Sequence, residues 1–355
     1  MILEKRIQSF IRLGEKLKLV LNDSKGNKDY DFEEFCLDAI ANNGWFTYES
    51  IKLALEGIIK YLGEDALRKW LNNYKINKST NQQIYKSKKV GVIMAGNIPL
   101  VGFHDFLTVL LSGHHIHVKL SSQDNILLKK IAGILIEIEP GFKELIHFAG
   151  KHAYFMQYPL DAIIATGSGN SARYFEYYFR NKPHIIRKNR TSCAILDGSE
   201  DIDDFRLLGD DTFRFFGLGC RNVSKLFVPN EWNEFDKFFK SIKSFDYITD
   251  HPKYANNYQY NKAILRVNKV KHFDNGFLLM TENDALASPI SMLYYEHYRS
   301  LSDLNDKIKL ANNKIQCIVS RKAWHLGSIE FAETQRPYVW DYADGVDTMK
   351  FLLSL

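Results

Sequence analysis

The chain has 355 residues, of which 45% are hydrophobic and 25% charged, a balance that predicts a soluble globular protein of about two domains. The formal net charge of +5 is small, and lysines and arginines are interspersed with acidic residues, which argues against nucleic-acid binding. We expect no membrane span and a cytoplasmic location, because apolar runs are too short and the first residues lack an unbroken signal segment.

The expected elements begin with helices and continue as alternating strands and helices. Apolar residues within 1–86 recur near a 3.6-residue period, and Thr47 is a suitable N-cap for the second helical run. From residue 89, short apolar runs alternate with helical segments, which is the pattern of βαβ units around a parallel sheet. Another set of strands and helices is predicted from about residue 185. The sequence therefore predicts an α/β protein of two lobes with a helical N-terminal segment.

Polar stretches follow two of the expected strands, at the edge where open parallel sheets bind ligands. In "VIMAGNIP", the amide of Asn97 suits an oxyanion donor, or a plain Asx turn. "HVKLSS" offers Lys119, Ser121 and Ser122 with no acid before Asp124. This set favours a ribose 2′-phosphate and hence NADP, and the alternative is that Lys119 simply leaves the sheet for solvent.

A glycine turn follows a third expected strand and precedes an amphipathic helix, in "IIATGSGNSARYF". Backbone N–H groups at such a turn can meet a phosphate. The candidate residues for cofactor contact are Thr166, Gly167, Ser168 and Gly169. The alternative is a tight turn in which Ser168 caps the helix.

Cys220 lies among glycines in "FGLGCRNVSKLFV" and is the candidate nucleophile. Thiolates are the reactive form of cysteine, and neighbouring glycines let backbone N–H groups approach the sulfur and an oxyanion. Arg214, Arg221 and Lys225 would lower the pKa of the thiol if they pointed toward it. The alternative is a cysteine that fills the core.

Metal and disulfide sites are not predicted. The four cysteines form no CxxC pair, and His114, His115 and His117 have no acidic or cysteine partner nearby. The run "RKNR", residues 187–190, is interpreted as a solvated turn.

In order along the chain, these stretches resemble the aldehyde dehydrogenase superfamily, and within it the acyl-CoA reductases typified by the fatty-acid reductase of bacterial bioluminescence. The resemblance begins near residue 44 and extends to the closing "RPYVWDYADGVDTMKFLLSL". It implies four parts, which are a helical segment packed on the cofactor domain, a Rossmann-like NADP-binding domain, a catalytic domain with the cysteine, and a tail. Their expected ranges are 1–86, 87–186, 187–345 and 346–355.

The resemblance also implies roles for single residues. Cys220 is then the nucleophile, and Asn97 with the Cys220 backbone N–H holds the oxyanion. Lys119, with Ser121 and Ser122 beside it, meets the adenosine ribose, and the turn from Thr166 to Gly169 lies at the cofactor.

One departure from the family pattern bears on the reaction. Aldehyde-oxidising relatives carry a water-activating glutamate just before the first strand of the second lobe, where this chain reads "HIIRKNRTSCAIL" with no acid before Asp197. Without that base an acyl-enzyme persists until a hydride arrives. We therefore expect NADPH-dependent reduction of a long-chain acyl-CoA to an aldehyde.

Other activated acyl groups stay open as substrates, either an acyl phosphate or a chain delivered by an acyl-protein synthetase or acyl carrier. A cysteine acyltransferase or thioesterase without nicotinamide chemistry is the alternative from another class. The resemblance also predicts a homo-oligomer.

Overall fold

The computed structural model describes residues 1–22, 31–74, 87–150, 155 and 158–355. The chain divides into two compact units, Met1–Lys188 with Tyr338–Leu355, and Asn189–Pro337. Parts of the predicted segment 1–86, namely 23–30 and 75–86, lie outside the described residues. The second unit ends at Pro337, whereas the predicted catalytic domain extends to residue 345; the four-part division stays a prediction.

A parallel sheet forms the centre of the first unit. Its strands, in the order β3-β2-β1-β4-β5, are β1 (Lys89–Ile93), β2 (His115–Lys119), β3 (Ile146–Phe148), β4 (Ala162–Thr166) and β5 (His184–Arg187). The chain adds β2 and β3 on one side of β1, then returns to add β4 and β5 on the other. The order therefore reverses between β1 and β4, the point where open sheets of this kind bind ligands.

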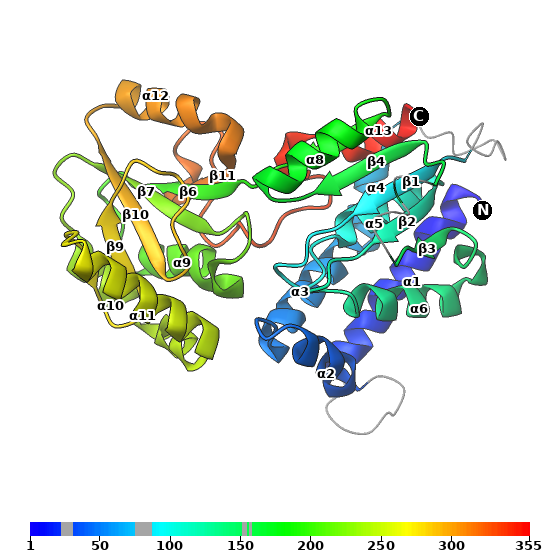
Figure 1. Cartoon of the computed structure of the whole chain (residues 1–355), viewed down its shortest axis with the longest axis horizontal. Coiled ribbons are helices and arrows are strands. Elements are labelled where there is room, and N and C mark those ends of the chain that lie inside the picture. The colour runs from blue at the N-terminus through cyan, green and yellow to red at the C-terminus, as the bar shows by residue number, and fades with distance from the viewer. Residues whose placement is uncertain (23–30, 75–86, 151–154, 156–157) are drawn as a thin grey trace. The chain divides into compact units, whose positions relative to one another are not determined.

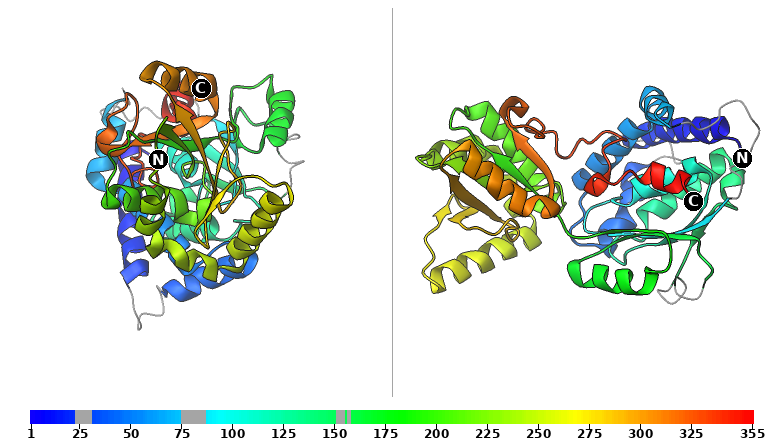
Figure 2. Two further views of the ribbon diagram at one scale, coloured as in Figure 1. Left: turned by 90° about the vertical axis from the view of Figure 1, so that its left-hand side faces the viewer. Right: turned by 90° about the horizontal axis from the view of Figure 1, so that it is seen from above.

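Helices cover both faces of this sheet. Helix α8 packs on β4 and β5, while α5 packs on β1 and β2 from the opposite face. In Figure 2 (right), α8, in green, is the helix on one face of the sheet, and the other helices of the unit lie on the opposite face. The helices of the unit are α1 (Leu3–Asn22), α2 (Phe32–Asn42), α3 (Tyr48–Tyr61), α4 (Glu64–Asn72), α5 (Phe103–Ser112), α6 (Leu127–Ile138), α8 (Gly169–Phe179) and α13 (Thr348–Leu353), with 3₁₀ turns η1 (Pro140–Phe142) and η6 (Ala343–Gly345). The predicted N-cap is confirmed, because the Thr47 hydroxyl accepts from the Ser50 N–H at the start of α3.

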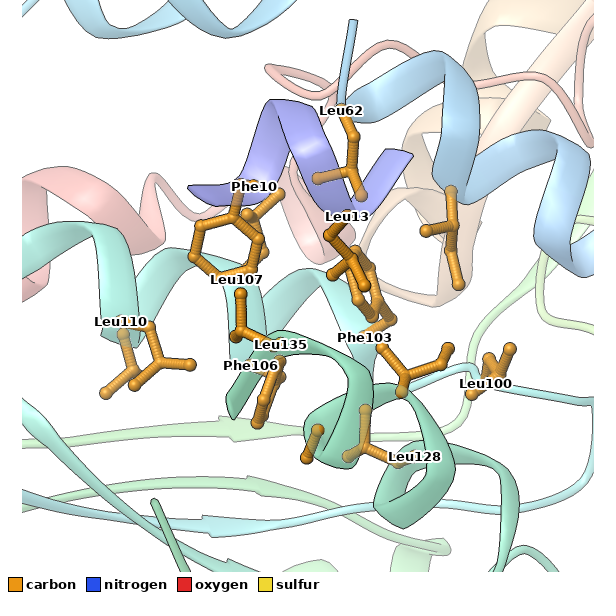
Figure 3. Packing of buried hydrophobic residues seen from close by; sticks show 14 of the residues in the cluster. Phe10, Leu13, Leu62, Leu100, Phe103, Phe106, Leu107, Leu110, Leu128 and Leu135 are labelled. Carbon is orange, nitrogen blue, oxygen red and sulfur yellow. The ribbon is translucent and has the colours of Figure 1, made fainter. Parts of the chain in front are cut away.

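The core of the first unit lies between α1, α5 and α6. Figure 3 shows Phe10 and Leu13 of α1 meeting Phe103 and Leu107 of α5, and all four are at most 1% exposed. Burial of each such side chain contributes about 2 kcal/mol. The predicted N-terminal helices are thus part of the core that holds the sheet in place.

A second sheet forms the centre of the other unit (Figure 1). Its strands, in the order β11-β6-β7-β10-β9-β8, are β6 (Thr191–Ile195), β7 (Val223–Pro229), β8 (Phe273–Asp274), β9 (Leu279–Glu282), β10 (Met292–Tyr298) and β11 (Ile315–Ser320); β8 is antiparallel to β9 and the other pairs are parallel. In Figure 1, α12 (Leu301–Ala311) lies on one face, and α9 (Ile202–Phe213), α10 (Phe235–Ser241) and α11 (Pro252–Val267) lie on the other. The 3₁₀ turns are η2 (Arg214–Gly217), η3 (Lys243–Asp250), η4 (Asn312–Lys314) and η5 (Arg321–Ala323).

None of the described helices combines the length and the apolar character that crossing a bilayer requires.

Candidate active site

The loop after β1 carries Asn97 and is held by its neighbour, the loop after β2. A Cβ atom on Gly96 would lie only 2.6 Å from the Cβ of Ser121, so only glycine permits this approach. Further along, the Leu100 N–H donates to Oδ2 of Asp124 at 2.7 Å. Asn97, which is half-buried, therefore belongs to a loop fixed on both sides of it.

Asp124 is a buried anchor for this loop. Asp124 is only 6% exposed, and its Oδ1 has no hydrogen-bond partner among the described residues. Burial raises the pKa of the carboxyl to about 6, although the hydrogen bond from the Leu100 N–H acts to lower it. The first acid after β2 thus points into the protein and binds the loop of Asn97.

The loop after β2 presents polar groups at the carboxyl end of the sheet. Lys119 is the last residue of β2 and is half-buried, with its Nζ 3.3 Å from the Leu120 carbonyl oxygen. Ser121 accepts from the Gln123 N–H at 3.2 Å, and Ser122 is exposed. No carboxylate lies among these residues, because Asp124 is turned inward.

The glycine turn after β4 begins a helix. Thr166 ends β4, and Ser168 is the N-cap of α8, with its hydroxyl accepting from the Ser171 N–H. A Cβ atom on Gly167 would lie 2.8 Å from the Cβ of Ser171, whereas one on Gly169 would meet nothing within 4 Å. The turn is therefore closely packed at Gly167 and open to solvent at Gly169.

The eight candidate residues of the first unit follow β1, β2 and β4, which are adjacent in the sheet. They lie at its carboxyl edge, on both sides of the point where the strand order reverses. Backbone N–H groups at the start of α8 and the side chains of the other two loops make this edge suited to a nucleotide.

Arg187 corrects one interpretation of the sequence. The run 187–190 was predicted to be a solvated turn, but Arg187 is 6% exposed and its guanidinium pairs with both oxygens of Asp105, at 2.5 and 2.9 Å. It also donates to the Thr348 hydroxyl at 2.9 Å. The pair fastens α5 and α13 to the end of β5, whose Arg187 carbonyl accepts from the Gly167 N–H at 3.2 Å. Its partners Asp105 and Thr348 are 82 and 161 residues away in the chain, so no local motif predicts this role.

His114 and His117 of the run "GHHIH" contact other groups of the protein. His114 accepts from the Lys88 N–H and bonds to the Leu352 carbonyl, and the ring of His117 lies tilted against those of His147 and Tyr158, at 5.2 and 4.8 Å between centroids. No cluster of three or more metal-ligating side chains occurs in the part of the chain that the structure describes.

Cys220 lies in the second unit, in the turn just before β7, and is exposed. All four cysteines are described and all are thiols. Cys36 and Cys193 are buried, and burial raises the pKa of the Cys36 thiol to about 12, so these two suit the core rather than chemistry. By exposure, Cys220 is the thiol best placed to meet a substrate.

Asn222 fixes the turn that carries Cys220. Its Oδ1 accepts from the Gly219 N–H at 2.8 Å, and its Nδ2 donates to the carbonyls of Asp211, Thr212 and Arg214. These bonds tie the turn to the end of α9. Sequence reasoning missed Asn222, although an asparagine two residues after a candidate nucleophile is a signal that could have been used.

The bend before Cys220 is strained. Phe215 and Phe216 have φ angles of 52° and 59°, in the left-handed region that favours glycine. Two such residues cost about 1–3 kcal/mol each. The bonds of Asn222 offset this strain, because without them the buried carbonyls of Asp211 and Thr212 and the partly buried carbonyl of Arg214 would lose a donor.

Two of the three cations that could have activated the thiol pair elsewhere. Arg214 lies 3.3 Å from Asp210, and Lys225 is 1% exposed and bonds to Glu296 and to the Asp284 carbonyl. The condition under which these two cations would lower the pKa of the Cys220 thiol is therefore not met by their contacts. The charge of Arg221 acts on the neighbouring thiol of Cys317, whose pKa it tends to lower against the larger effect of burial.

Carboxylates after β6 lie away from Cys220. Cys220 precedes β7, and its carbonyl meets Ser192 near the amino end of β6, whereas Asp197 follows the carboxyl end of the same strand. At ~3.3 Å per strand residue, the five residues from Ser192 to Asp197 span roughly 16 Å. Glu200 lies at that same far end, where it accepts from the Asp197 N–H.

The chain matches the model of a known protein family over most of its length. The family model described as acyl-CoA reductase (LuxC) matches residues 43–278, a range that includes all nine candidate site residues. A search of curated proteins gave no match.

Solved structures with a similar fold are aldehyde dehydrogenases. Aldehyde dehydrogenase 21 from Physcomitrella patens, in complex with succinate, has a TM-score of 0.68 and 13% identity over 100% of this chain and 84% of its own. Indole-3-acetaldehyde dehydrogenase AldA from P. syringae, in complex with NAD+, has a TM-score of 0.67 and 14% identity over 95% of this chain and 75% of its own. An aldehyde dehydrogenase from Bacillus cereus, in complex with NAD+, gives 0.63 and 14% over 90% and 72%. The likeness confirms the predicted fold class, an aldehyde-dehydrogenase-like α/β protein of two lobes with a helical N-terminus.

Proposed function

The chain belongs to the acyl-CoA reductase (LuxC) family of the aldehyde dehydrogenase superfamily, and on this premise we propose that it reduces a long-chain fatty acyl-CoA to an aldehyde with NADPH, through an S-acyl intermediate on Cys220. The observation that carries the proposal is the exposed thiol of Cys220 in a turn fixed by Asn222.

The first half-reaction would be acylation of Cys220. Its thiolate attacks the thioester carbonyl carbon, the bond from that carbon to the CoA sulfur breaks, and CoA leaves as a thiolate that takes up a proton. We assign the Asn97 side-chain amide and the Cys220 backbone N–H as donors to the oxyanion. Support comes from the anchoring of each loop within its own unit, by Asp124 in the first and Asn222 in the second, since a donor held in place stabilises an oxyanion better than a mobile one.

The acyl-enzyme would be protected from water. The segment before β6 contains no carboxylate, and Asp197 and Glu200 lie at the other end of that strand. General-base catalysis is typically worth 10²–10⁴-fold, so an acyl-enzyme without a base is hydrolysed slowly. This favours reduction over thioester hydrolysis and disfavours a thioesterase.

The cofactor would lie at the carboxyl edge of the first sheet. Gly167, Ser168, Gly169 and Thr166 would hold its phosphates, and the open space at Gly169 fits a group that approaches the helix N-terminus. Lys119, Ser121 and Ser122 would hold the adenosine ribose. When bound, NADPH supplies the hydride that reduces the acyl carbon, and Cys220 then departs as the thiolate and releases the aldehyde.

The preference for NADPH over NADH rests on charge. Lys119 is a cation at the end of β2, and the carboxylate of Asp124 is buried and bonded to the Leu100 N–H. A carboxylate facing the ribose would repel a 2′-phosphate, and the residues after β2 present none.

Acylation and reduction can be tested in one experiment. Wild type and Cys220→Ala are incubated with a long-chain acyl-CoA, analysed by intact mass, and then given NADPH or NADH while aldehyde is assayed. We expect an acyl adduct and aldehyde only with the wild type, and faster turnover with NADPH. Acyl phosphate and acyl-carrier donors are run in parallel, and a thiol-dependent adduct that NADPH never reduces would refute the proposed reaction.

A further inference from the structure

Ser192, the second residue of β6, connects the nucleophile to another cysteine. Its side chain is fully buried, and its Oγ lies 3.1 Å from the Cys220 carbonyl oxygen and 2.9 Å from Sγ of Cys317. The Cys317 N–H also donates to the Ser192 Oγ, at 3.3 Å. One hydroxyl on β6 therefore contacts Cys220, 28 residues away in the chain, and Cys317 of β11, 125 residues away.

The protons of this cluster have one favoured arrangement. Burial raises the pKa of the Cys317 thiol to about 11, so at neutral pH its S–H is retained and can donate to Ser192. The Ser192 hydroxyl has a single proton, and the Cys220 carbonyl can only accept. The hydrogen bonds thus run from the Cys317 S–H to the Ser192 oxygen, and from the Ser192 O–H to the Cys220 carbonyl.

The two hydrogen bonds through Ser192 complete the fixation of the Cys220 backbone. Asn222 holds the Gly219 N–H, on the amino side of Cys220, while Ser192 holds the Cys220 carbonyl, on its carboxyl side. The two bonds restrain the backbone that sets the direction of the Cys220 thiol and of its N–H. They also oppose the strain of the left-handed residues upstream.

We propose that Ser192 and Cys317 are positioning residues that hold Cys220 in the geometry required for acylation. The role rests on the proposed function, in which Cys220 is the nucleophile. Neither residue touches the substrate in this scheme. Cys317 acts through Ser192, and Ser192 acts through the Cys220 carbonyl.

The decisive comparison is between two reactions of the same thiol. p-Nitrophenyl acetate acylates a cysteine through an oxyanion, whereas iodoacetamide alkylates it without one, and neither reagent needs CoA or a nicotinamide. In Ser192→Ala we expect acylation of Cys220 to slow by about tenfold, the effect of one lost hydrogen bond at a reacting centre. The rate of alkylation by iodoacetamide should differ from that of the wild type by less than about threefold, because alkylation needs no aligned N–H donor.

Matched variants separate positioning from packing. Cys193→Ala removes the adjacent side chain of β6, which is fully buried and belongs to the cluster packed under α12. It should lower thermal stability and leave the ratio of acylation to alkylation as in the wild type. Cys317→Ser keeps a donor for Ser192 and should retain more of the acylation rate than Cys317→Ala.

The outcomes decide the proposal. Unchanged acylation in Ser192→Ala, or an equal loss of acylation and alkylation, would overturn the positioning role. If the wild type is acylated at Cys220 by the ester but not by acyl-CoA, only the acyl donor of the proposed function fails. If Cys220 is acylated by neither reagent, both proposals fail together.

Discussion

Asp124→Asn tests whether the loop that carries Asn97 is anchored by a buried carboxylate. Asn keeps an oxygen that can accept from the Leu100 N–H and removes the charge. The buried amide NH₂ would add a cost of about 1–3 kcal/mol that does not depend on pH. The prediction therefore concerns how the difference in stability between the two proteins changes with pH.

The magnitude follows from the pKa of Asp124. Burial raises it from 3.8 to about 6, so below pH 6 the folded protein takes up a proton that the unfolded chain takes up only near pH 4. This carboxyl therefore adds stability as the pH falls. Between pH 7.5 and pH 5 the wild type should gain about 1.4 kcal/mol relative to the Asn variant. His117, whose pKa burial lowers to about 4, acts in the opposite direction but is present in both proteins and cancels.

Urea unfolding at pH 7.5, 6 and 5 measures this difference. Hydrogen exchange of peptides from α5 and β2 assigns the transition to the first unit, which contains Asp124. Asp65→Asn, at an exposed position of α4, serves as the control for loss of one negative charge. A stability difference between wild type and Asp124→Asn that stays constant within about 0.5 kcal/mol from pH 7.5 to pH 5 would refute the buried anchor.

Three further predictions concern the other loops. Asn222→Ala should destabilise the second unit by about 2–3 kcal/mol and slow acylation, since several backbone groups lose their partner; urea unfolding and acyl-adduct rates check this. Ser122→Glu should lower the ratio of kcat/KM for NADPH to that for NADH by about tenfold or more, because a carboxylate there repels a 2′-phosphate; steady-state kinetics with both cofactors would show a constant ratio if the ribose lies elsewhere. Gly96→Ala should lower the melting temperature, because the added Cβ would collide with Ser121. Gly169→Ala, whose Cβ would meet open space, should keep the melting temperature and raise KM for the nicotinamide cofactor. Equal melting temperatures for the two variants would contradict the packing around Gly96.

Local patterns carried most of what the sequence could predict. Helical periodicity in 1–86, strand–helix alternation from residue 89 and the cap at Thr47 all depend on neighbours within a few residues, and the fold bears them out. The candidates after β1, β2 and β4 could be grouped in advance because parallel strands of one sheet end at one edge. Their chemical roles stay predictions.

Contacts between distant segments could not be predicted in this way. Arg187 pairs with Asp105, 82 residues away, and Ser192 meets Cys317, 125 residues away. Neither partner is marked by a local motif, because the topology of the sheet decides which side chains meet. The same limit explains why the direction of Lys225 and Arg214 stayed open at the level of sequence, since a charged residue in the sequence does not reveal its counterion.

The direction of the strands bears on the fate of an acyl-enzyme. In parallel β6 and β7, a residue before a strand and a residue after it serve opposite ends of the sheet. Cys220 comes before β7, and Asp197 and Glu200 come after β6, so no change of rotamer could bring these carboxylates to the thiol. The residues before β6, at the end of the strand nearer Cys220, are Arg187, Lys188, Asn189 and Arg190, and none of them carries a carboxylate. Cations and an amide cannot take a proton from water at neutral pH, so these four residues offer no general base for the hydrolysis of an acyl group on Cys220, as the proposed reaction requires.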